Sequence, residues 1–313
     1  MLGSTPSRWR PRGHPYPHII YMAHSKSFFG LRRGSTKTLT FSVYNGKQVT
    51  KDRVTDVKNP RSSAQMMQRA IMATALHGYS ALKEICDHSF EGVTYGQRSM
   101  NYFVAENARM IRSAAPDVNL STYKGIAVSN AYIIAKGSLP SIELMGKPDE
   151  SYFTLDQTFT GTFTFAQLMA AFGGSMIGDM VTFVALVDNP GTDASVYWLR
   201  LKLTEGNKTK SFTVSESKNI VASLSEGTDF ETNIDNFSAN DFSISYLSNE
   251  NKIAIAVSNE EKQSMGVIVS RKSDTGWLRS SSTMVNIQNT FNYAEALASY
   301  PESGDKILNG GNV

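Results

Sequence analysis

Residues 26–60 read KSFFGLRRGSTKTLTFSVYNGKQVTKDRVTDVKNP, and residues 61–90 read RSSAQMMQRAIMATALHGYSALKEICDHSF. In the first segment Leu39, Phe41 and Val43 alternate with threonine and serine, a period of two that predicts a β-strand. Asn45-Gly46 follows directly, and this dipeptide is the strongest short signal for a hairpin turn. The segment therefore predicts a β-hairpin that carries many basic residues.

The register of this hairpin stays open. A return strand is expected at about residues 48–57. A two-residue loop would pair Val43 with Gln48, whereas a three-residue loop would pair Val43 with Val49 and make one face more uniformly apolar. The sequence does not choose between them.

The second segment has the pattern of a capped helix. Asn59-Pro60 ends the strand and can begin a helix, since proline suits a first helical turn. Ser62 with Gln65 also fits a capping box. Apolar or small residues then form one helical stripe: Met67, Ile71, Ala75, Gly78, Leu82 and Ile85. After the glycines at 92 and 96, a second helix is expected at about residues 97–112, with Met100, Phe103 or Val104, Asn107 and Ile111 on one side.

The rest of the chain has β character. Thr164 with Gln167 predicts one short capped helix, closed by Gly173-Gly174. Short strand-like runs surround it, with Gly, Asn, Asp and Ser between them, which favours antiparallel sheets over parallel βαβ units. The stretch at 225–241, SEGTDFETNIDNFSAND, is expected to be a long solvated loop. The predicted fold class is α+β, mostly β: an N-terminal hairpin and two helices, then an antiparallel β-sandwich or barrel.

Four regions follow from this pass along the chain. We expect a disordered extension at 1–25, a basic hairpin and helical domain at 26–140, a β-sandwich region at 141–300 and a mobile tail at 301–313. Regular patterning begins after Met22, so one interpretation places the biological start there. The alternative is that the Arg- and Pro-containing residues 1–21 form a basic arm that contacts nucleic acid.

Composition places the chain among folded proteins, since 41% of its 313 residues are hydrophobic and 19% are charged. Its single cysteine, Cys86, rules out an intramolecular disulfide and fits a small core residue. No secretory signal and no apolar run of the ~18 residues that a membrane-spanning helix needs is visible. We therefore expect no membrane association.

The usual motifs of enzymes are missing. His77 and His88 lie eleven positions apart, about 16 Å along a helix, and with Cys86 they match no zinc-ligand spacing. GLRRGST lacks the spacing and lysine of a phosphate-binding P-loop, and GGSMIGD is not a nucleophile elbow. The sequence thus predicts no enzyme, no cofactor and no metal site.

Positive charge is concentrated at the N-terminal end. Residues 1–61 hold twelve Lys and Arg against two acids, a net of +10, whereas the whole chain is +3, so residues 62–313 carry −7. The candidate nucleic-acid-binding residues are Arg32, Arg33, Lys37, Lys47, Lys51 and Arg53, with aromatic residues interleaved. The competing interpretation is a solvated sheet edge whose lysines prevent aggregation.

A second basic patch comprises Arg271, Lys272 and Arg279 around Trp277. The indole of Trp277 could stack on a base or on a guanidinium, or it could fill the rim of the sandwich.

Several of these motifs occur together in a known family. FFG, YNGKQV, NPRSSAQMMQR, SMNYF and YKGIAVSNAYI resemble a hairpin–helix–β-sandwich family of gut Bacteroidota and their phages and mobile elements. Asn59, Pro60 and Gln65 match its helix start directly, with Ser62 and Ser63 near its small-hydroxyl position. The resemblance covers about the first 140 residues, and more weakly 178–187. It implies a pair of immunoglobulin-like modules after the hairpin and helices, a phage or mobile-element gene, and with it a location in a virion or the host cytoplasm. It transfers no functional residue, because the family has no assigned activity.

Two functions of different classes follow. The first is a non-enzymatic phage or mobile-element structural protein whose basic N-terminal region contacts DNA or RNA, and which assembles as a homo-oligomer or with virion proteins. The second is an immunoglobulin-like surface, adhesion or protein-interaction module of a bacterium, which would require an export signal that the sequence does not display.

Overall fold

The computed structural model describes residues 23–25, 33–44, 47–53, 62–114, 130–147, 151–187, 194–213, 219–257 and 263–287. Met22, Arg32, the Asn45-Gly46 turn, the Asn59-Pro60 junction and the expected tail at 301–313 lie outside these residues. The chain forms two compact units, Met1–Pro60 and Arg61–Val313. Each unit is described by itself.

The first unit is a four-stranded antiparallel sheet in the order β1-β4-β3-β2. Its strands are β1 Ala23–Ser25, β2 Gly34–Ser35, β3 Leu39–Tyr44 and β4 Lys47–Asp52. Val43 pairs with Gln48 and Tyr44 with Lys47, so the connection has two residues and the register left open by the sequence is the tighter one. The sequence assigned residues 1–25 to a disordered extension, whereas Ala23–Ser25 pair with β4.

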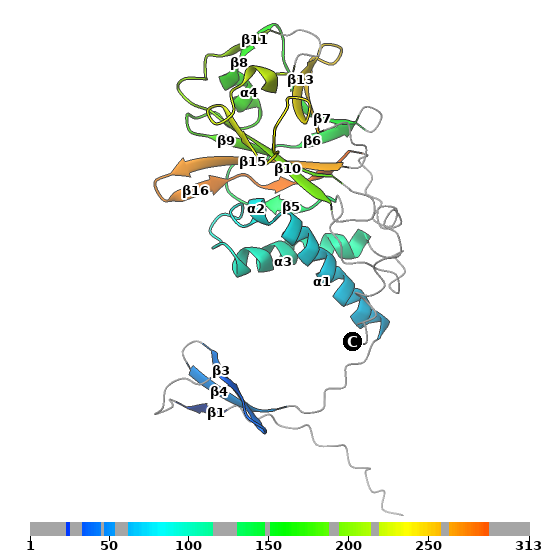
Figure 1. Ribbon diagram of the computed structural model, residues 1–313, viewed down its shortest axis with the longest axis vertical. Coiled ribbons are helices and arrows are strands. Elements are labelled where there is room, and N and C mark those ends of the chain that lie inside the picture. The colour runs from blue at the N-terminus through cyan, green and yellow to red at the C-terminus, as the bar shows by residue number, and fades with distance from the viewer. Residues whose placement is uncertain are drawn as a thin grey trace, which may run out of the picture. The chain divides into compact units, whose positions relative to one another are not determined.

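The second unit combines the helices with the larger sheets (Figure 1). The sequence placed the hairpin and the helices in a single domain at 26–140. The structure divides the chain differently, since the hairpin forms its own unit and the helices share a hydrophobic core with strands from the C-terminal half. The reason is that the buried stripe of the helices needs a broad apolar surface, which a small hairpin does not offer.

Three helices form one layer: α1 Ser63–Ala81, α2 Lys83–Cys86 and α3 Gln97–Ala114. Ser62 caps α1, and its side chain accepts a hydrogen bond from the backbone N–H of Gln65 at 3.4 Å. The expected stripes face inward, because Ile71 and Ala75 on α1, Leu82 at its C-cap, and Phe103 and Ile111 on α3 are all at most 2% exposed. The apolar periodicity of both helices is confirmed.

Two antiparallel sheets form the other layers. The larger has the order β12-β10-β9-β15-β16, with β18 also paired to β15, and the smaller has the order β13-β14-β7-β6. The strands are β5 Ile133–Ala135, β6 Leu144–Lys147, β7 Tyr152–Thr158, β8 Thr162–Thr164, β9 Met180–Val187, β10 Ser195–Lys202, β11 Ser211–Thr213, β12 Phe230–Thr232, β13 Phe242–Leu247, β14 Lys252–Val257, β15 Gln263–Ser273, β16 Gly276–Arg279, β17 Ser282–Thr283 and β18 Val285–Asn286. Short pairs β11-β8 and β17-β5, the helix α4 Phe165–Ala171 and a 3₁₀ turn at Val221–Ser223 complete the unit.

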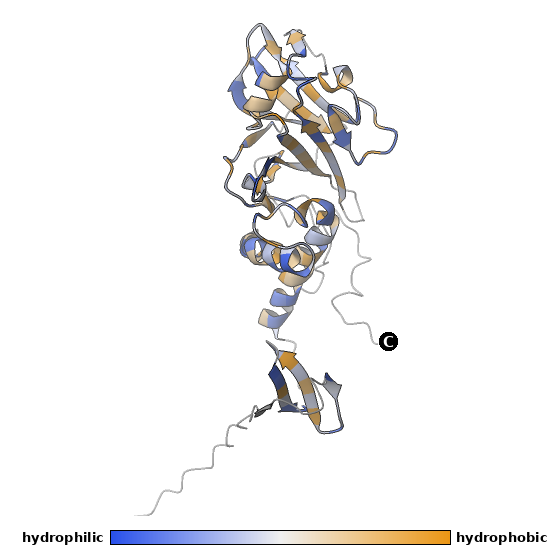
Figure 2. Ribbon diagram, turned by 90° about the vertical axis from the view of Figure 1, so that its left-hand side faces the viewer, coloured by the Kyte–Doolittle hydropathy of each residue, from blue (hydrophilic) through white to orange (hydrophobic). Residues whose placement is uncertain are grey.

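Alternate side chains of the larger sheet enter two different cores. Val181, Phe183, Leu199 and Val267 face the smaller sheet and α4, whereas Val184, Leu186, Trp198 and Ile268 face the helices. Figure 2 shows hydrophobic residues (orange) along the strands of this unit. The unit is thus layered as helices, larger sheet and smaller sheet, which confirms an α+β fold that is mostly β. This strand order does not establish an immunoglobulin-like topology.

One local expectation is wrong. The acidic stretch at 225–241 is not simply a solvated loop, because Phe230–Thr232 pair with β10 as strand β12 and Asp229 is only 3% exposed. Its Ser- and Asn-rich composition hid the strand, whose Phe230 is buried in the core between the sheets. Within the part of the chain that the structure describes, no helix has the length and apolar character to cross a membrane.

Candidate nucleic-acid interface

The hairpin of the first unit has two unlike faces. Because paired residues of an antiparallel sheet point to the same side, the register places Tyr44 with Lys47 and Thr40 with Lys51 on one face. Lys47 and Lys51 are exposed, and Tyr44 is 71% exposed. Leu39, Phe41 and Val43 lie on the opposite face and are half-buried. The two lysines and the tyrosine therefore point to one face of the hairpin, on which Val49, between the two lysines, is buried.

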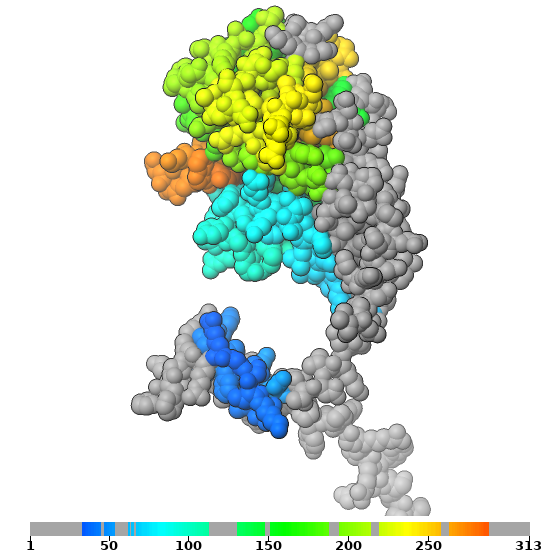
Figure 3. Space-filling view, in the orientation of Figure 1, coloured from blue at the N-terminus to red at the C-terminus, as the bar shows by residue number. Residues whose placement is uncertain are grey.

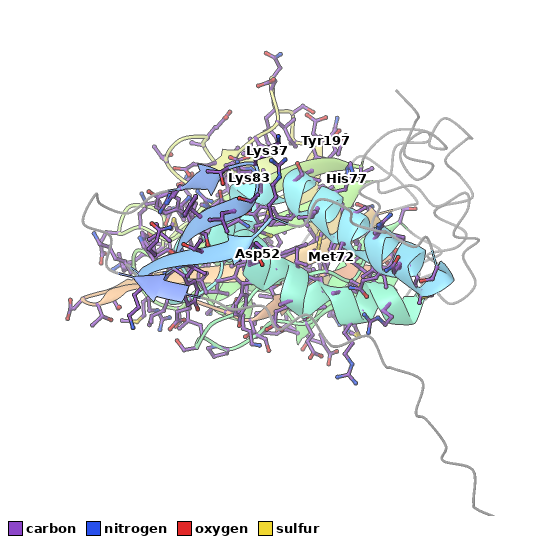
Figure 4. All side chains as sticks on the ribbon, turned by 90° about the horizontal axis from the view of Figure 1, so that it is seen from below. Lys37, Asp52, Met72, His77, Lys83 and Tyr197 are labelled. Carbon is purple, nitrogen blue, oxygen red and sulfur yellow. The ribbon has the colours of Figure 1, made fainter. Side chains whose placement is uncertain are left out.

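Charge on this surface is of one sign. Asp52 is the only acid among the described residues of the first unit, and it pairs with Leu39 on the apolar face (Lys37 and Asp52 are labelled in Figure 4). Among the described residues, no carboxylate forms an ion pair with Lys47 or Lys51. Their ammonium groups are thus available to an external anion.

The other predicted residues occupy the far end of the hairpin. Arg53 donates from its backbone N–H to the Thr38 carbonyl at 2.7 Å and from Nη1 to the Thr36 carbonyl at 3.4 Å. Its side chain therefore lies along the loop that holds Lys37, and both residues are exposed. Arg33 is also exposed, immediately before β2, whereas Arg32 lies outside the described residues. The structure brings Lys37 and Arg53 together at one end and leaves Lys47 at the turn.

The second basic patch is only partly free to bind a ligand. It lies on the β15–β16 hairpin, which projects from the body of the second unit (orange in Figure 3). Arg271 makes a bidentate ion pair with Asp179, with Nε to Oδ1 at 2.9 Å and Nη2 to Oδ2 at 2.7 Å. This hydrogen-bonded pairing raises the pKa of Arg271. Asp179 is 1% exposed, so Arg271 serves the fold rather than a ligand.

Trp277 stacks on a guanidinium rather than filling the rim of the sandwich. The guanidinium carbon of Arg279 lies 5.0 Å from the centre of the indole ring, a cation–π distance, and Trp277 remains 44% exposed. Trp277 and Arg279 therefore present a combined aromatic and cationic surface.

The residues that motif spacing singled out for metal or redox chemistry lie elsewhere. Cys86 is fully buried, and this burial raises the pKa of its thiol, as expected for a core cysteine. His88 stacks on Tyr95 with ring centres 5.9 Å apart. Over the described ranges, no three His, Cys, Asp or Glu side chains gather in a way that could hold a metal ion.

Comparison with known proteins adds no relative: no family model, curated protein or solved structure matches this chain.

Proposed function

We propose that this protein is a non-enzymatic structural protein of a phage or mobile element, and that it binds nucleic acid through the β3–β4 hairpin. One observation carries the proposal: Lys47, Lys51 and Tyr44 are exposed on the same face of the hairpin, and that face holds no acid among the described residues. The same proposal places the protein in a virion or in the host cytoplasm. It also includes assembly of the protein into homo-oligomers or with virion proteins.

The spacing of the two lysines suits a phosphate backbone. Lys51 lies four positions after Lys47 on the same strand, about 13 Å away at 3.3–3.4 Å per residue. One strand of duplex DNA advances 3.4 Å per nucleotide, so the two ammonium groups span about four nucleotides. Lys37 and Arg53 extend the positive charge beyond Lys51. Contacts of this kind bind by counterion release and carry little sequence information.

Tyr44 adds a second mode of contact. Its ring lies directly opposite Lys47 and is largely exposed, and an exposed aromatic ring next to a cation can stack on an unpaired base. We therefore expect single-stranded nucleic acid to bind more tightly than duplex of the same length. Replacing Tyr44 by alanine should weaken single-strand binding by about 1–3 kcal/mol and leave duplex binding unchanged.

The test is fluorescence anisotropy with labelled DNA and RNA, single- and double-stranded, at about 50–200 mM salt. The logarithm of the binding constant should fall steeply and linearly with the logarithm of the salt concentration. In the double variant Lys47→Gln/Lys51→Gln the slope should become shallower by about 1.4–1.8, since each phosphate contact contributes about 0.7–0.9. The matched control is Arg98→Gln/Arg109→Gln, which removes the same charge from exposed positions on α3 and should leave the slope unchanged.

Two outcomes would reject this proposal. The first is no binding at the lowest salt, which would make the hairpin a solvated sheet edge and direct attention to a protein-interaction role. The second is an equal loss in both double variants, which would mean that net charge rather than the hairpin face controls binding.

A further inference from the structure

A small pocket lies where α2 meets the larger sheet, outside the hairpin unit. Its volume is about 80 Å³. From the sheet it is lined by Thr182, Ile268 and Ser270 together with Arg200 and Arg279. From the side of α2 it is lined by Glu84, Ile85, His88 and Ser89. The pocket marks the place where the helices stop covering the sheet, because the next residues inward on the same face, such as Val184 and Trp198, are buried under them.

Strand pairing brings the two arginines to this pocket. Arg200 on β10 pairs with Thr182 on β9, and Arg279 on β16 pairs with Ser270 on β15. Because β9 and β15 are neighbours, the two arginines reach the pocket from strands on opposite sides. Between them lie the hydroxyl groups of Thr182 and Ser270 and the apolar side chain of Ile268, which pairs with Thr182. Both hydroxyl residues are nearly buried, Thr182 at 4% and Ser270 at 7% exposed.

Arg200 is held in place by several contacts. Its Nε donates to the Thr182 hydroxyl at 3.2 Å, its Nη1 to Glu231 at 3.3 Å, and its guanidinium carbon lies 5.0 Å from the ring centre of Trp198. Since the Thr182 oxygen accepts this bond, its own proton remains available to a ligand.

Arg279 is equally fixed. Its Nε donates to the His88 carbonyl at 3.0 Å, its Nη1 to the Leu278 carbonyl at 3.4 Å, and its side chain stacks on Trp277. Among the described residues, none accepts a hydrogen bond from Nη2 of Arg279 or from Nη2 of Arg200. One donor on each guanidinium is thus left without a protein partner.

The two positive charges oppose each other in this pocket. Burial, and next the nearby charge of Arg200, lower the pKa of Arg279, and the negative charge of Glu91 opposes this shift in part. The neighbouring acids are engaged by other donors: Glu84 accepts from the Trp198 indole at 3.2 Å, and Glu91 accepts from the backbone N–H groups of Ser138 and Arg279 at 2.9 and 3.1 Å. A bound anion between the guanidinium groups would relieve their repulsion.

We propose that this pocket binds a phosphate group between Arg200 and Arg279, over the hydroxyl groups of Thr182 and Ser270. Two free guanidinium donors and two hydroxyl groups match the tetrahedral oxygens and the charge of a phosphate dianion. At about 80 Å³ the pocket takes one such group and is far smaller than the roughly 300–1,000 Å³ of sites for whole small molecules. The phosphate can be free or the end of a larger ligand that extends past the exposed Trp277. This site is independent of the proposed hairpin function.

Isothermal titration of the full chain with inorganic phosphate at pH 8, against chloride at equal ionic strength, tests the site. We expect saturable binding that weakens at least about tenfold in Arg279→Gln and in Arg200→Gln. Glu84→Gln should tighten binding by about two- to fivefold, since it removes a negative charge from the wall. Such a gain cannot come from a folding defect. Lys252→Gln, which removes one positive charge from the smaller sheet, is the matched control and should leave the affinity unchanged.

Competition identifies the source of the phosphate. Displacement by 5′-phosphorylated dithymidine but not by its unphosphorylated form assigns a terminal monoester. Displacement by both forms assigns a nucleic-acid backbone, and displacement by neither assigns inorganic phosphate. The proposal is overturned if phosphate shows no saturable heat, if both arginine variants bind as tightly as the parent chain, or if Glu84→Gln weakens binding. The double variant Lys47→Gln/Lys51→Gln should retain phosphate binding, which separates this site from the hairpin.

Discussion

Asp229 shows how a single residue acquires a role that its sequence neighbourhood conceals. Its carboxylate accepts hydrogen bonds from Asn207 at 3.1 Å and from the backbone N–H of Ser225 at 2.9 Å, and it pairs with Lys210. Burial opposes ionisation, but Lys210, Ser225 and Asn207 together outweigh it and hold the pKa of Asp229 below its usual value. The ionised carboxylate therefore stabilises the fold where β12 begins.

Replacing Asp229 by asparagine should lower the free energy of unfolding at pH 7 by about 1–3 kcal/mol, the usual cost of a lost charge-assisted hydrogen bond. The folded-state pKa lies below the unfolded value of about 3.9, so this stabilisation is complete above that value and disappears as the pH falls through the folded pKa. Urea unfolding at pH 7 and pH 3 measures the effect. The difference between parent and variant should shrink at pH 3, and an equal difference at both pH values would contradict the assignment.

At the scale of elements, α4 is the clearest case of a helix specified by its own sequence. The Thr164 hydroxyl accepts from the backbone N–H of Gln167 at 3.3 Å, and the Gln167 side chain accepts from the backbone N–H of Thr164 at 2.7 Å. This is the capping box expected from the sequence. Phe165 and Leu168 then bury the helix in the core between the two sheets.

The substitution Thr164→Ala should lower stability by about 1 kcal/mol, because the first turn of α4 loses its cap. Thermal unfolding monitored by circular dichroism measures this change. Thr160→Ala, at an exposed position four residues earlier, is the matched control and should be neutral. If Thr164→Ala lowered the stability no more than Thr160→Ala, core packing alone would hold the helix.

At the scale of the second unit, the larger sheet couples the helices to the smaller sheet. Its central strands β9, β10 and β15 send alternate side chains into the core under the helices and into the core between the sheets. Any rearrangement of those strands disturbs both cores at once. We therefore expect the helices and the sheets of this unit to unfold together.

Phe103→Ala tests this coupling. Phe103 is fully buried on α3, with ring centres 5.6 Å from Tyr79 and 5.7 Å from Tyr132, so the cavity should cost about 3–5 kcal/mol. Urea unfolding followed by far-ultraviolet circular dichroism and by tryptophan fluorescence should give coincident transitions, both shifted to lower urea. Arg109→Ala on the exposed side of α3 should shift neither. Two separated transitions in Phe103→Ala would show that the helix layer is an independent unit.

Patterns within one element were largely readable from the sequence. The 3.6-residue stripe of α1, the cap of α4 and the alternation of β3 each depend on residues a few positions apart. The candidate site was readable only in part. Lys47 and Lys51 could be selected by charge, and so could Arg279 as part of the second basic patch. The meeting of Arg279 with Arg200 could not, because the two residues are far apart in sequence and no motif spacing links them.

Local chemistry thus decided where the helices, strands and turns of this protein form, since backbone preferences and apolar periodicity act over a few residues. Tertiary structure alone decided the two-residue register of the hairpin, the pairing of β12 with β10 and the meeting of the two arginines. It also decided that Arg271 forms an ion pair with Asp179, 92 positions away in the sequence. The physical reason is that strand pairing and burial are settled by the best simultaneous packing of distant segments, and only that packing determines which charges remain free to bind.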